Sequence, residues 1–377
     1  MMPWVLAAGD FTTRGGMDRA NHALAWHLAV SGREVHLVAH RVAPPLAALP
    51  GVVVHAVPRP LGSHLLGAPL LSRAASAVAA RVGPRARLLA NGGNTRWTAP
   101  TWIHYVHAAH TPHVSAGARA RAIAAAGRRW FLAREREAIA RASAVICNSA
   151  RTAADVRRHY RADEDRVHVV YYGTDARRFG AITCDERAAA RAALELDPAR
   201  AAALFVGALG DRRKGFDLLF EAWRQLSGER GWDVDLLVAG EGAEAAAWEQ
   251  RARSAGLSGR MRFLRFRDDI PRVLAACDLV VHPARYEAYG LGVHEAISRG
   301  LPSIVSAAAG VTERIPASLA PLIVPDPLTV EAVIGRLRLW RRDTPGWKAL
   351  AEDAGVALRA RSWDDMAAAI VGLLEPA

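Results

Sequence analysis

Short hydrophobic runs alternate with longer amphipathic stretches along the 377 residues of this chain. Runs of roughly four to seven apolar residues are typical of buried strands, and apolar residues recurring every three or four positions are typical of helices. In the first half, the runs predict strands at Pro3–Ala8, Glu34–Ala39, Val52–Val57, Arg87–Ala90, Thr101–His107, Ala144–Asn148 and Val167–Tyr172. In the second half, they predict strands at Ala202–Gly207, Asp235–Ala239, Arg262–Phe266, Leu279–His282, Ser303–Ser306 and Leu322–Val324.

Most stretches between these strands have the periodicity of helices. The predicted helices cover Asp18–Val30, Arg119–Ala142, Ala150–Tyr160, Phe216–Leu226, Glu244–Ala255, Pro271–Ala276 and Gly292–Arg299. Apolar strands that alternate with helices indicate parallel sheets covered on both faces. We therefore predict an α/β fold of two doubly wound domains, residues 1–178 and 179–361. A last helix, Trp363–Leu374, is expected to carry residues from about 362 to 377 back onto the first domain.

The composition excludes several classes of protein. With 51% hydrophobic and 23% charged residues, the chain is too apolar to be disordered. No apolar run approaches the ~20 residues of a membrane-spanning helix, and the apolar N-terminal segment is too short for a signal peptide. We therefore expect a cytoplasmic protein. Cys147, Cys184 and Cys277 lie too far apart in sequence to suggest a disulfide framework or a zinc knuckle.

The positive charge is concentrated in the first half of the chain. Residues 1–178 contain 24 arginines and 10 acidic residues, a net charge of +14, whereas the remainder carries −2. This asymmetry predicts an acidic partner, such as a phosphate-bearing substrate or an anionic membrane surface. The basic stretch Arg119–Arg141 would suit peripheral membrane contact, or it is an ordinary helix with a solvated face. Nucleic acid is not expected, because the basic residues are not interleaved with aromatic residues in any known module.

Two glycine-containing segments follow predicted strands, where α/β proteins bind their ligands. Gly15 and Gly16 follow the first strand and precede a helix, so their amides could approach a phosphate, or they simply form a tight turn. The segment from Gly207 to Asp217 contains three consecutive cations, Arg212, Arg213 and Lys214. Such a cluster can hold a diphosphate and stabilise it as a leaving group, although a solvated loop is the simpler alternative.

Two glutamates form the most informative motif. Glu287 and Glu295 stand eight residues apart and bracket a glycine-containing turn, Ala288-Tyr289-Gly290-Leu291, that starts a helix. Carboxylates in these positions can accept hydrogen bonds from sugar hydroxyls, and the amides of the turn can approach a phosphate. The alternative is that both are ordinary surface glutamates.

The spacing of four histidines and of two aspartates resembles that of metal ligands. We nevertheless expect no metal site at either position. His104, His107, His110 and His113 recur every third residue, but the first two lie in a predicted strand, where such positions face opposite sides. Asp233-Val234-Asp235 leads into its strand, at the wrong end of the sheet for a ligand. We therefore predict no essential metal and no cofactor.

In order along nearly the whole chain, these motifs resemble the family 4 retaining glycosyltransferases of the GT-B fold. Further matching segments are Asn148-Ser149, Val169–Asp175, Gly240-Glu241-Gly242, Gly300-Leu301-Pro302 and Ser362-Trp363-Asp364. The resemblance implies two Rossmann-like domains facing a cleft, with a C-terminal helix that crosses back to the first domain.

The resemblance also implies roles for individual residues. Glu287 would contact the donor sugar, Glu295 the nucleotide ribose, Lys214 the diphosphate and Gly16 the donor phosphates. A histidine at the end of its strand would lie at the reaction centre, and His107 fits best, with His104 and His110 as alternatives. Catalysis is thus assigned to His107, Glu287 and Lys214.

One position departs from the family pattern. The family often has arginine directly after a glycine where this chain has Gly207-Ala208. Arg212 or Arg213 is the expected replacement for that cation. Arg212, Arg213, Ala288, Tyr289, Gly290 and Leu291 complete the predicted donor site.

The predicted function is transfer of a hexose from a nucleotide sugar to an acceptor hydroxyl, with retention of configuration. The acceptor would be a glycan, a lipid-linked intermediate or a small molecule, and an anionic acceptor would suit the basic first domain. We expect the reaction to take part in cell-envelope polysaccharide synthesis, at the inner face of the membrane. The alternatives are a GT-B sugar-nucleotide epimerase and a non-catalytic protein that binds nucleotide sugars.

Overall fold

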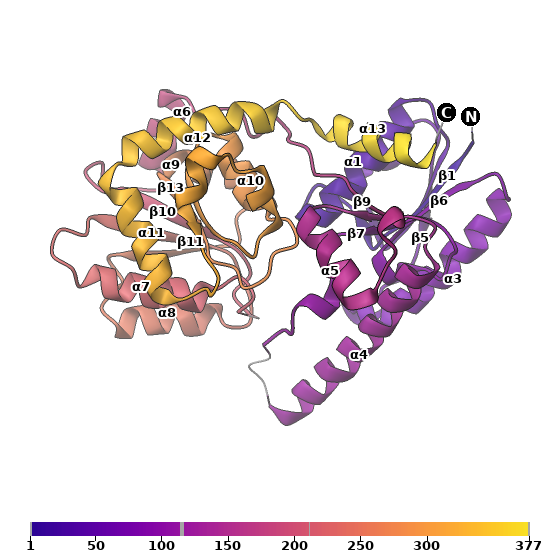
Figure 1. Cartoon of the computed structure of the whole chain (residues 1–377), viewed down its shortest axis with the longest axis horizontal. Helices are drawn as coiled ribbons and strands as arrows, with labels where there is room; N and C mark the ends of the chain where they lie inside the picture. Colours follow the sequence, from indigo (N-terminus) through magenta and orange to yellow (C-terminus); the bar gives the residue numbers. More distant parts are fainter. Residues whose placement is uncertain (1, 114–116, 211, 376–377) are drawn as a thin grey trace. The chain divides into compact units, whose positions relative to one another are not determined.

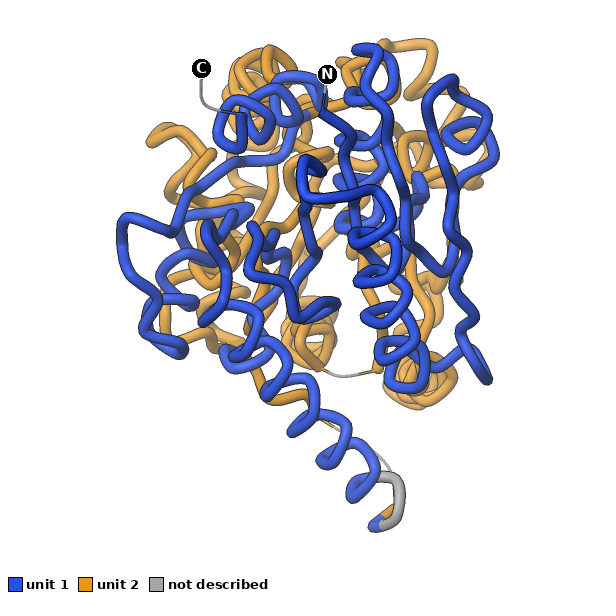
Figure 2. The backbone as a smooth tube through the Cα atoms, turned by 90° about the vertical axis from the view of Figure 1, so that its right-hand side faces the viewer, with its two compact units in different colours: residues 1–109, 118–173, 362–377 blue, residues 110–117, 174–361 orange. Residues whose placement is uncertain are grey.

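A computed structural model describes residues 2–113, 117–210 and 212–375 of the chain. It divides into two compact units, which Figure 2 distinguishes by colour. Unit 1 contains residues 1–109, 118–173 and 362–377, and unit 2 contains residues 110–117 and 174–361. Apart from residues 110–117, the chain changes unit after residues 173 and 361. The boundaries predicted from the sequence were after residue 178 and near residue 362.

Unit 1 is built on a parallel sheet of seven strands in the order β5-β3-β1-β6-β7-β8-β9. These strands are β1 (Trp4–Ala7), β3 (Val35–Ala39), β5 (Val52–Ala56), β6 (Arg87–Asn91), β7 (Thr101–Ile103), β8 (Val145–Cys147) and β9 (Val167–Val169). The short strands β2 (Asp10–Phe11) and β4 (Arg41–Val42) pair separately. The helices are α1 (Gly16–Val30), α2 (Pro44–Ala47), α3 (His64–Val82), α4 (Ala118–Arg141), α5 (Ala150–Tyr160) and α13 (Trp363–Leu374).

The C-terminal helix α13 belongs to unit 1, as predicted. It packs against α1, and Figure 1 shows the two helices side by side. A capping box between Ser362 and Asp365 starts the helix. At its end, Glu375 accepts hydrogen bonds from the Trp4 indole (3.1 Å) and the Arg33 guanidinium (2.6 Å). The helix is therefore capped at its start and held to the rest of unit 1 at its end.

Unit 2 is built on a parallel sheet of six strands in the order β12-β11-β10-β13-β14-β15. The strands are β10 (Ala201–Val206), β11 (Val234–Ala239), β12 (Met261–Arg265), β13 (Leu279–His282), β14 (Ser303–Ser306) and β15 (Ile323–Val324). The helices are α6 (Cys184–Ala193), α7 (Phe216–Ser227), α8 (Ala245–Ser254), α9 (Ile270–Ala276), α10 (Leu291–Ser298), α11 (Val330–Arg342) and α12 (Thr344–Arg359).

The central strand of unit 2 shows why the strands are apolar throughout. In β10, Ala203 and Phe205 join one hydrophobic cluster, while Ala202 and Leu204 join another. Successive side chains of a strand point to opposite faces, so the sheet is buried on both sides. This arrangement confirms the predicted α/β class with parallel sheets.

Several predicted elements differ from the structure. The strand predicted at Thr101–His107 ends at Ile103, and the one predicted at Val167–Tyr172 ends at Val169. Helices α2, α3, α6, α11 and α12 were not predicted. Of these, α6 begins just after the predicted domain boundary at residue 178.

Helix α3 also qualifies the prediction about membrane-spanning segments. By length (19 residues) and mean hydropathy (1.2) alone, this one helix among the described residues is apolar enough to cross a membrane. Its Leu71, Ala75 and Val78, however, pack into a cluster with Val5 and Val38 of the sheet. One face of the helix therefore packs against the sheet.

The chain changes unit at two points, and the unit 1 residues at those points, Gly173 and Ser362, make a close backbone contact. A Cβ atom added to Gly173 would lie 2.0 Å from the carbonyl oxygen of Ser362. We expect Gly173→Ala to lower the free energy of unfolding by about 2 kcal/mol, because the backbones must separate. Gly372→Ala is the matched control, since Gly372 is an exposed glycine in α13 with open space around it. It should stabilise by about 1 kcal/mol. Urea denaturation measures both, and equal effects would contradict the contact.

Candidate active site

Glu287 lies in the loop between β13 and α10, at the carboxyl end of the unit 2 sheet. The loop is held to the segment that follows β14. The Glu287 amide donates to the carbonyl of Ala308 (3.4 Å), and the Gly310 amide donates to the carbonyl of Glu287 (3.1 Å). Its backbone is therefore fixed where α/β folds bind their ligands.

The Glu287 carboxylate is nearly buried and is surrounded by cationic and proton-donating groups. Lys214 donates a hydrogen bond to it, His282 Nε2 lies 3.2 Å away, and an Arg213 nitrogen lies 3.6 Å away. Burial alone would raise the pKa of Glu287, but these three neighbours outweigh it and hold the pKa below its usual value. The carboxylate is therefore ionised at neutral pH and presents oxygens that can accept hydrogen bonds from hydroxyls.

A close backbone contact brings Lys214 to Glu287. Gly215 has φ +71°, and a Cβ atom there would lie 1.8 Å from the carbonyl oxygen of Pro283. The Arg285 amide also donates to the carbonyl of Arg213 (2.8 Å). The turn after β10 thus lies against the turn after β13. This explains why glycine follows the lysine in the motif.

The two candidate arginines separate in the structure. Arg213 lies at the Glu287 carboxylate and also donates to the carbonyl of Tyr286 (3.2 Å). The Arg212 guanidinium instead lies 3.8 Å from the Glu244 carboxylate. Ala208 is exposed and supplies no charge. Arg213 is therefore the arginine that joins Lys214 in this cluster.

Helix α10 begins directly after the Glu287 loop. Gly290 is its N-cap, with φ +105°, a conformation that suits glycine. The first amides of a helix have no partner within it, and its N-terminus favours negative charge. Ala288 and Tyr289 are buried in the approach to the helix, Leu291 is its first residue, and Glu295 is a buried residue one turn further on. The predicted donor-site residues 287–295 thus form one continuous structure.

A buried chain of hydrogen bonds, which the sequence did not reveal, holds this loop. The hydroxyl of Tyr289 lies 2.7 Å from His294 Nδ1, and His294 Nε2 lies 2.6 Å from the hydroxyl of Thr174. That hydroxyl donates to the carbonyl of Leu358 (2.9 Å), so it accepts from His294 Nε2–H, and Tyr289 donates to Nδ1. Burial lowers the pKa of His294 to about 3. The ring is therefore neutral and joins the loop to α12.

Gly16 and His107 lie in unit 1. Gly16 is the first residue of α1, after Gly15 with φ +75°. His107 follows the end of β7 in a short 3-10 helix, so the strand-alternation argument against a metal site does not apply to it. Its Nδ1 lies 3.0 Å from the carboxylate of Glu135 on α4, another contact that sequence reasoning missed.

The two alternatives to His107 have different surroundings. His104 is buried, its Nδ1 lies 2.5 Å from the Tyr172 hydroxyl, and burial lowers its pKa to about 3. His110 belongs to unit 2, where its ring stacks on that of Tyr286 with centroids 6.0 Å apart. Of the three, His107 combines a carboxylate partner with a partly exposed side chain, 41% of which is accessible.

Over residues 2–113, 117–210 and 212–375, no group of three or more histidine, cysteine or acidic side chains is arranged to hold a metal ion. Asp233 pairs with Arg341, and Asp235 pairs with Arg200. These two aspartates therefore serve in ion pairs.

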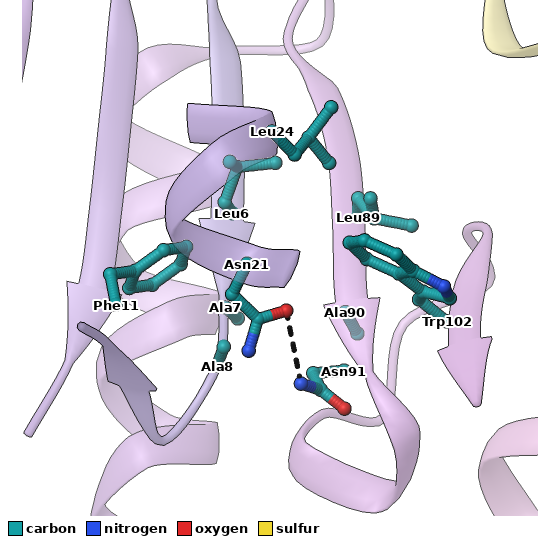
Figure 3. Close-up of a pocket in the computed structure, with 10 residues that line it drawn as sticks. All are labelled: Leu6, Ala7, Ala8, Phe11, Asn21, Leu24, Leu89, Ala90, Asn91 and Trp102. Atoms are coloured by element: carbon teal, nitrogen blue, oxygen red, sulfur yellow. Dashed lines mark hydrogen bonds between the residues drawn. The ribbon is translucent and has the colours of Figure 1, made fainter. Parts of the chain in front are cut away.

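A small apolar cavity lies beside α1 in unit 1 (Figure 3). Its volume is about 10 Å³, room for at most one water molecule. Asn91 donates to the side chain of Asn21 (3.2 Å) at its edge, and Trp102 closes one side. It is too small for a sugar, so the candidate site remains the Glu287 cluster of unit 2.

Two family descriptions match the chain in adjacent segments. "Glycosyltransferase Family 4" matches residues 14–178, and "Glycosyl transferases group 1" matches residues 200–338. D-inositol 3-phosphate glycosyltransferase of Mycobacterium sp. (strain KMS) is 36% identical over 184 residues, which are 47% of this chain and 40% of that protein. The chain thus spans less than half the length of this curated relative.

Solved structures match over the whole chain. WaaG, a glycosyltransferase involved in lipopolysaccharide biosynthesis, superposes with a TM-score of 0.80 at 19% identity, over 99% of this chain and 100% of that one. Anabaena HepE, in complex with UDP and glucose, has a TM-score of 0.73 at 19% identity, and both chains are covered completely. These similarities show that the fold is GT-B, as predicted.

The neutral state of His294 predicts a pH dependence of stability. Because the folded pKa (about 3) lies below the ordinary value of 6.5, only the unfolded state takes up a proton between these values. Stability is therefore lost as pH falls below 6.5, by about 2 kcal/mol from this group at pH 5. His294→Gln should shrink the difference in unfolding free energy between pH 7.5 and pH 5 by about that amount. The control His113→Gln, at an exposed histidine, should leave the difference unchanged; an unchanged difference in His294→Gln would contradict the assignment.

Proposed function

The chain belongs to the group 1 glycosyltransferases of family 4, and from that premise we propose that it transfers a hexose from a nucleotide sugar to an acceptor hydroxyl with retention of configuration. One observation carries the proposal: Glu287, Lys214 and Arg213 meet at the carboxyl end of the unit 2 sheet, beside the start of α10. A carboxylate suits sugar hydroxyls, and the adjacent cations and helix N-terminus suit a diphosphate.

The proposed roles follow from charge. The Glu287 carboxylate accepts hydrogen bonds from the hexose, and Glu295 accepts them from the nucleotide ribose. Lys214, Arg213 and the amides at the start of α10 neutralise the diphosphate as it leaves. The bond from the anomeric carbon to the diphosphate breaks while the bond to the acceptor oxygen forms on the same face. A donor phosphate oxygen takes the acceptor proton, and His107 positions the sugar.

The acceptor we favour is an anionic polyol. The basic first half of the chain, with its net charge of +14, supports a phosphate-bearing acceptor. The similar mycobacterial protein is named for inositol 3-phosphate, which is an acceptor of this class. UDP is the first nucleotide to test, because the similar HepE structure contains it. We further propose that transfer needs no metal and occurs in the cytoplasm, in synthesis of the cell envelope.

Nucleotide binding and transfer test the proposal. In calorimetry against UDP, GDP, dTDP and ADP, we expect selective binding of one nucleotide and loss of that binding in Glu295→Ala. Glu287→Ala and Lys214→Ala should reduce hexosyl transfer roughly 100-fold or more, because each removes charge complementarity at the reacting groups. Glu249→Ala is the control, since Glu249 pairs with Arg265 away from the cluster.

The rival functions give different results. Turnover of the nucleotide sugar without any acceptor would indicate an epimerase. Nucleotide binding without turnover would indicate a non-catalytic binding protein, and full transfer activity in Glu287→Ala would refute the proposed site.

We also propose that unit 1 contacts an anionic membrane through α4. Residues 121–126 of this helix are all exposed, among them Arg121 and Ile123, the latter with 60% of its surface accessible. Arg129 adds an exposed charge on the following turns. Exposed cations suit a surface of anionic lipid.

Flotation with liposomes tests the membrane contact. We expect the protein to float with vesicles that contain phosphatidylglycerol and not with phosphatidylcholine alone. Arg121→Glu/Arg129→Glu should abolish flotation, because two attractive charges become repulsive. Arg224→Glu, at an exposed arginine of unit 2, is the control. Absence of flotation at low ionic strength would refute the proposed membrane contact.

A further inference from the structure

His107 stands just beyond the carboxyl end of β7, the edge at which α/β sheets bind ligands. Its ring stacks on Phe131 of α4, with centroids 5.5 Å apart and an angle of 5° between the rings. One face of the ring is therefore covered. The ring also meets the Tyr105 ring edge to face, with centroids 5.1 Å apart, and the side chain as a whole remains 41% exposed.

One edge of the ring is held by a single buried carboxylate. The side chain of Glu135 is 2% exposed, and its Oε1 lies 3.0 Å from His107 Nδ1. Its Oε2 accepts a hydrogen bond from the backbone amide of His107 (2.9 Å) and another from the hydroxyl of Tyr160. Glu135 thus holds both the backbone and the ring of His107.

These contacts determine the proton on the imidazole. An ionised carboxylate only accepts hydrogen bonds, so Nδ1 of His107 carries a proton. Burial and Glu135 both raise the pKa of Tyr160, which keeps its hydroxyl protonated as a donor to the same carboxylate. When the ring is neutral, Nε2 therefore carries the lone pair, on the edge of the ring that Glu135 leaves open.

We propose that Glu135 is a positioning residue that holds His107 with Nδ1 protonated, so that Nε2 accepts a hydrogen bond from a hydroxyl of the transferred sugar. The inference rests on the proposed function for its ligand, but the state of the imidazole does not depend on that function. Glu135 touches no substrate, and its effect passes through His107.

The state of the imidazole is measured by nitrogen NMR on ¹⁵N-histidine-labelled protein at pH 8.5, with His107→Gln used to assign the signal. We expect Nδ1 of His107 to be protonated in the wild type. In Glu135→Gln, the amide can donate to Nδ1, so the protonated fraction at Nδ1 should fall. A wild-type ring protonated at Nε2 would overturn the proposal whatever the protein's activity is.

A double-mutant cycle tests whether Glu135 acts through His107. Glu135→Gln should reduce kcat roughly 10- to 100-fold and change KM for the nucleotide sugar much less, because a misplaced group is felt mainly in the transition state. Adding Glu135→Gln to His107→Ala should cause no further loss. An additive loss, or an unchanged kcat in Glu135→Gln, would overturn the proposal.

Two other variants keep the test interpretable. Glu135→Asp retains a carboxylate and should recover part of the activity lost in Glu135→Gln. If Glu135 only filled space, the glutamine, which has the same size, would instead be the better replacement. Glu137→Gln is the matched control on α4, where Glu137 pairs with Arg134 and Arg141. It should leave kcat unchanged. If wild-type protein neither binds nucleotides nor transfers sugar, the proposed function fails, and the NMR result alone decides the role of Glu135.

Discussion

A buried negative charge at the end of a sheet is the constraint on which the candidate site depends. The Glu287 carboxylate could not remain ionised there without the neighbouring Lys214 and Arg213, because burial of an unpaired charge is very unfavourable. The cations reach it only because Gly215 allows the turn after β10 to lie against Pro283. The same arrangement leaves charges of both signs next to the N-terminus of α10. In the proposed reaction, the negative charge holds the sugar and the positive charges hold the diphosphate.

In each unit, a buried polar side chain links separate elements near the carboxyl edge of the sheet. In unit 2, His294 joins Tyr289 of the Glu287 loop to Thr174 and, through it, to α12. In unit 1, Glu135 joins His107 to α4 and to Tyr160 on α5. In each case a single side chain satisfies donors or acceptors from separate elements. Such networks specify one conformation when they are fully satisfied. We infer that these two networks keep the candidate reactive groups in place.

The sequence predicted the α/β class, the approximate positions of most strands and the segments of the candidate site. Apolar runs such as Ala202–Gly207 are readable because both faces of the strand are buried. Glu287, Lys214 and Gly290 are readable because the turns that hold them have glycine signatures. Helix α3 was missed because it is rich in alanine, has no side-chain N-cap and contains Pro69. The predicted strand to His107 was too long, because apolar character continues past the last ladder residue, Ile103.

The residues that sequence reasoning missed depend on distant partners. Thr174 and His294 are 120 positions apart, and His107 and Glu135 are 28 positions apart, so no local pattern links either pair. The choice between Arg212 and Arg213 likewise required the fold, because adjacent residues turn to different carboxylates. Local spacing thus indicated the chemistry, whereas the tertiary contacts decided which side chains take part.

We propose that the Glu287 cluster is the donor site, and a crystal structure of the protein with a bound nucleotide sugar would show whether the donor lies there. We predict that the diphosphate contacts Lys214 and the amides at the start of α10, and that a hexose hydroxyl donates to Glu287. A nucleotide sugar bound elsewhere, with the Lys214–Glu287 contact undisturbed, would contradict the account.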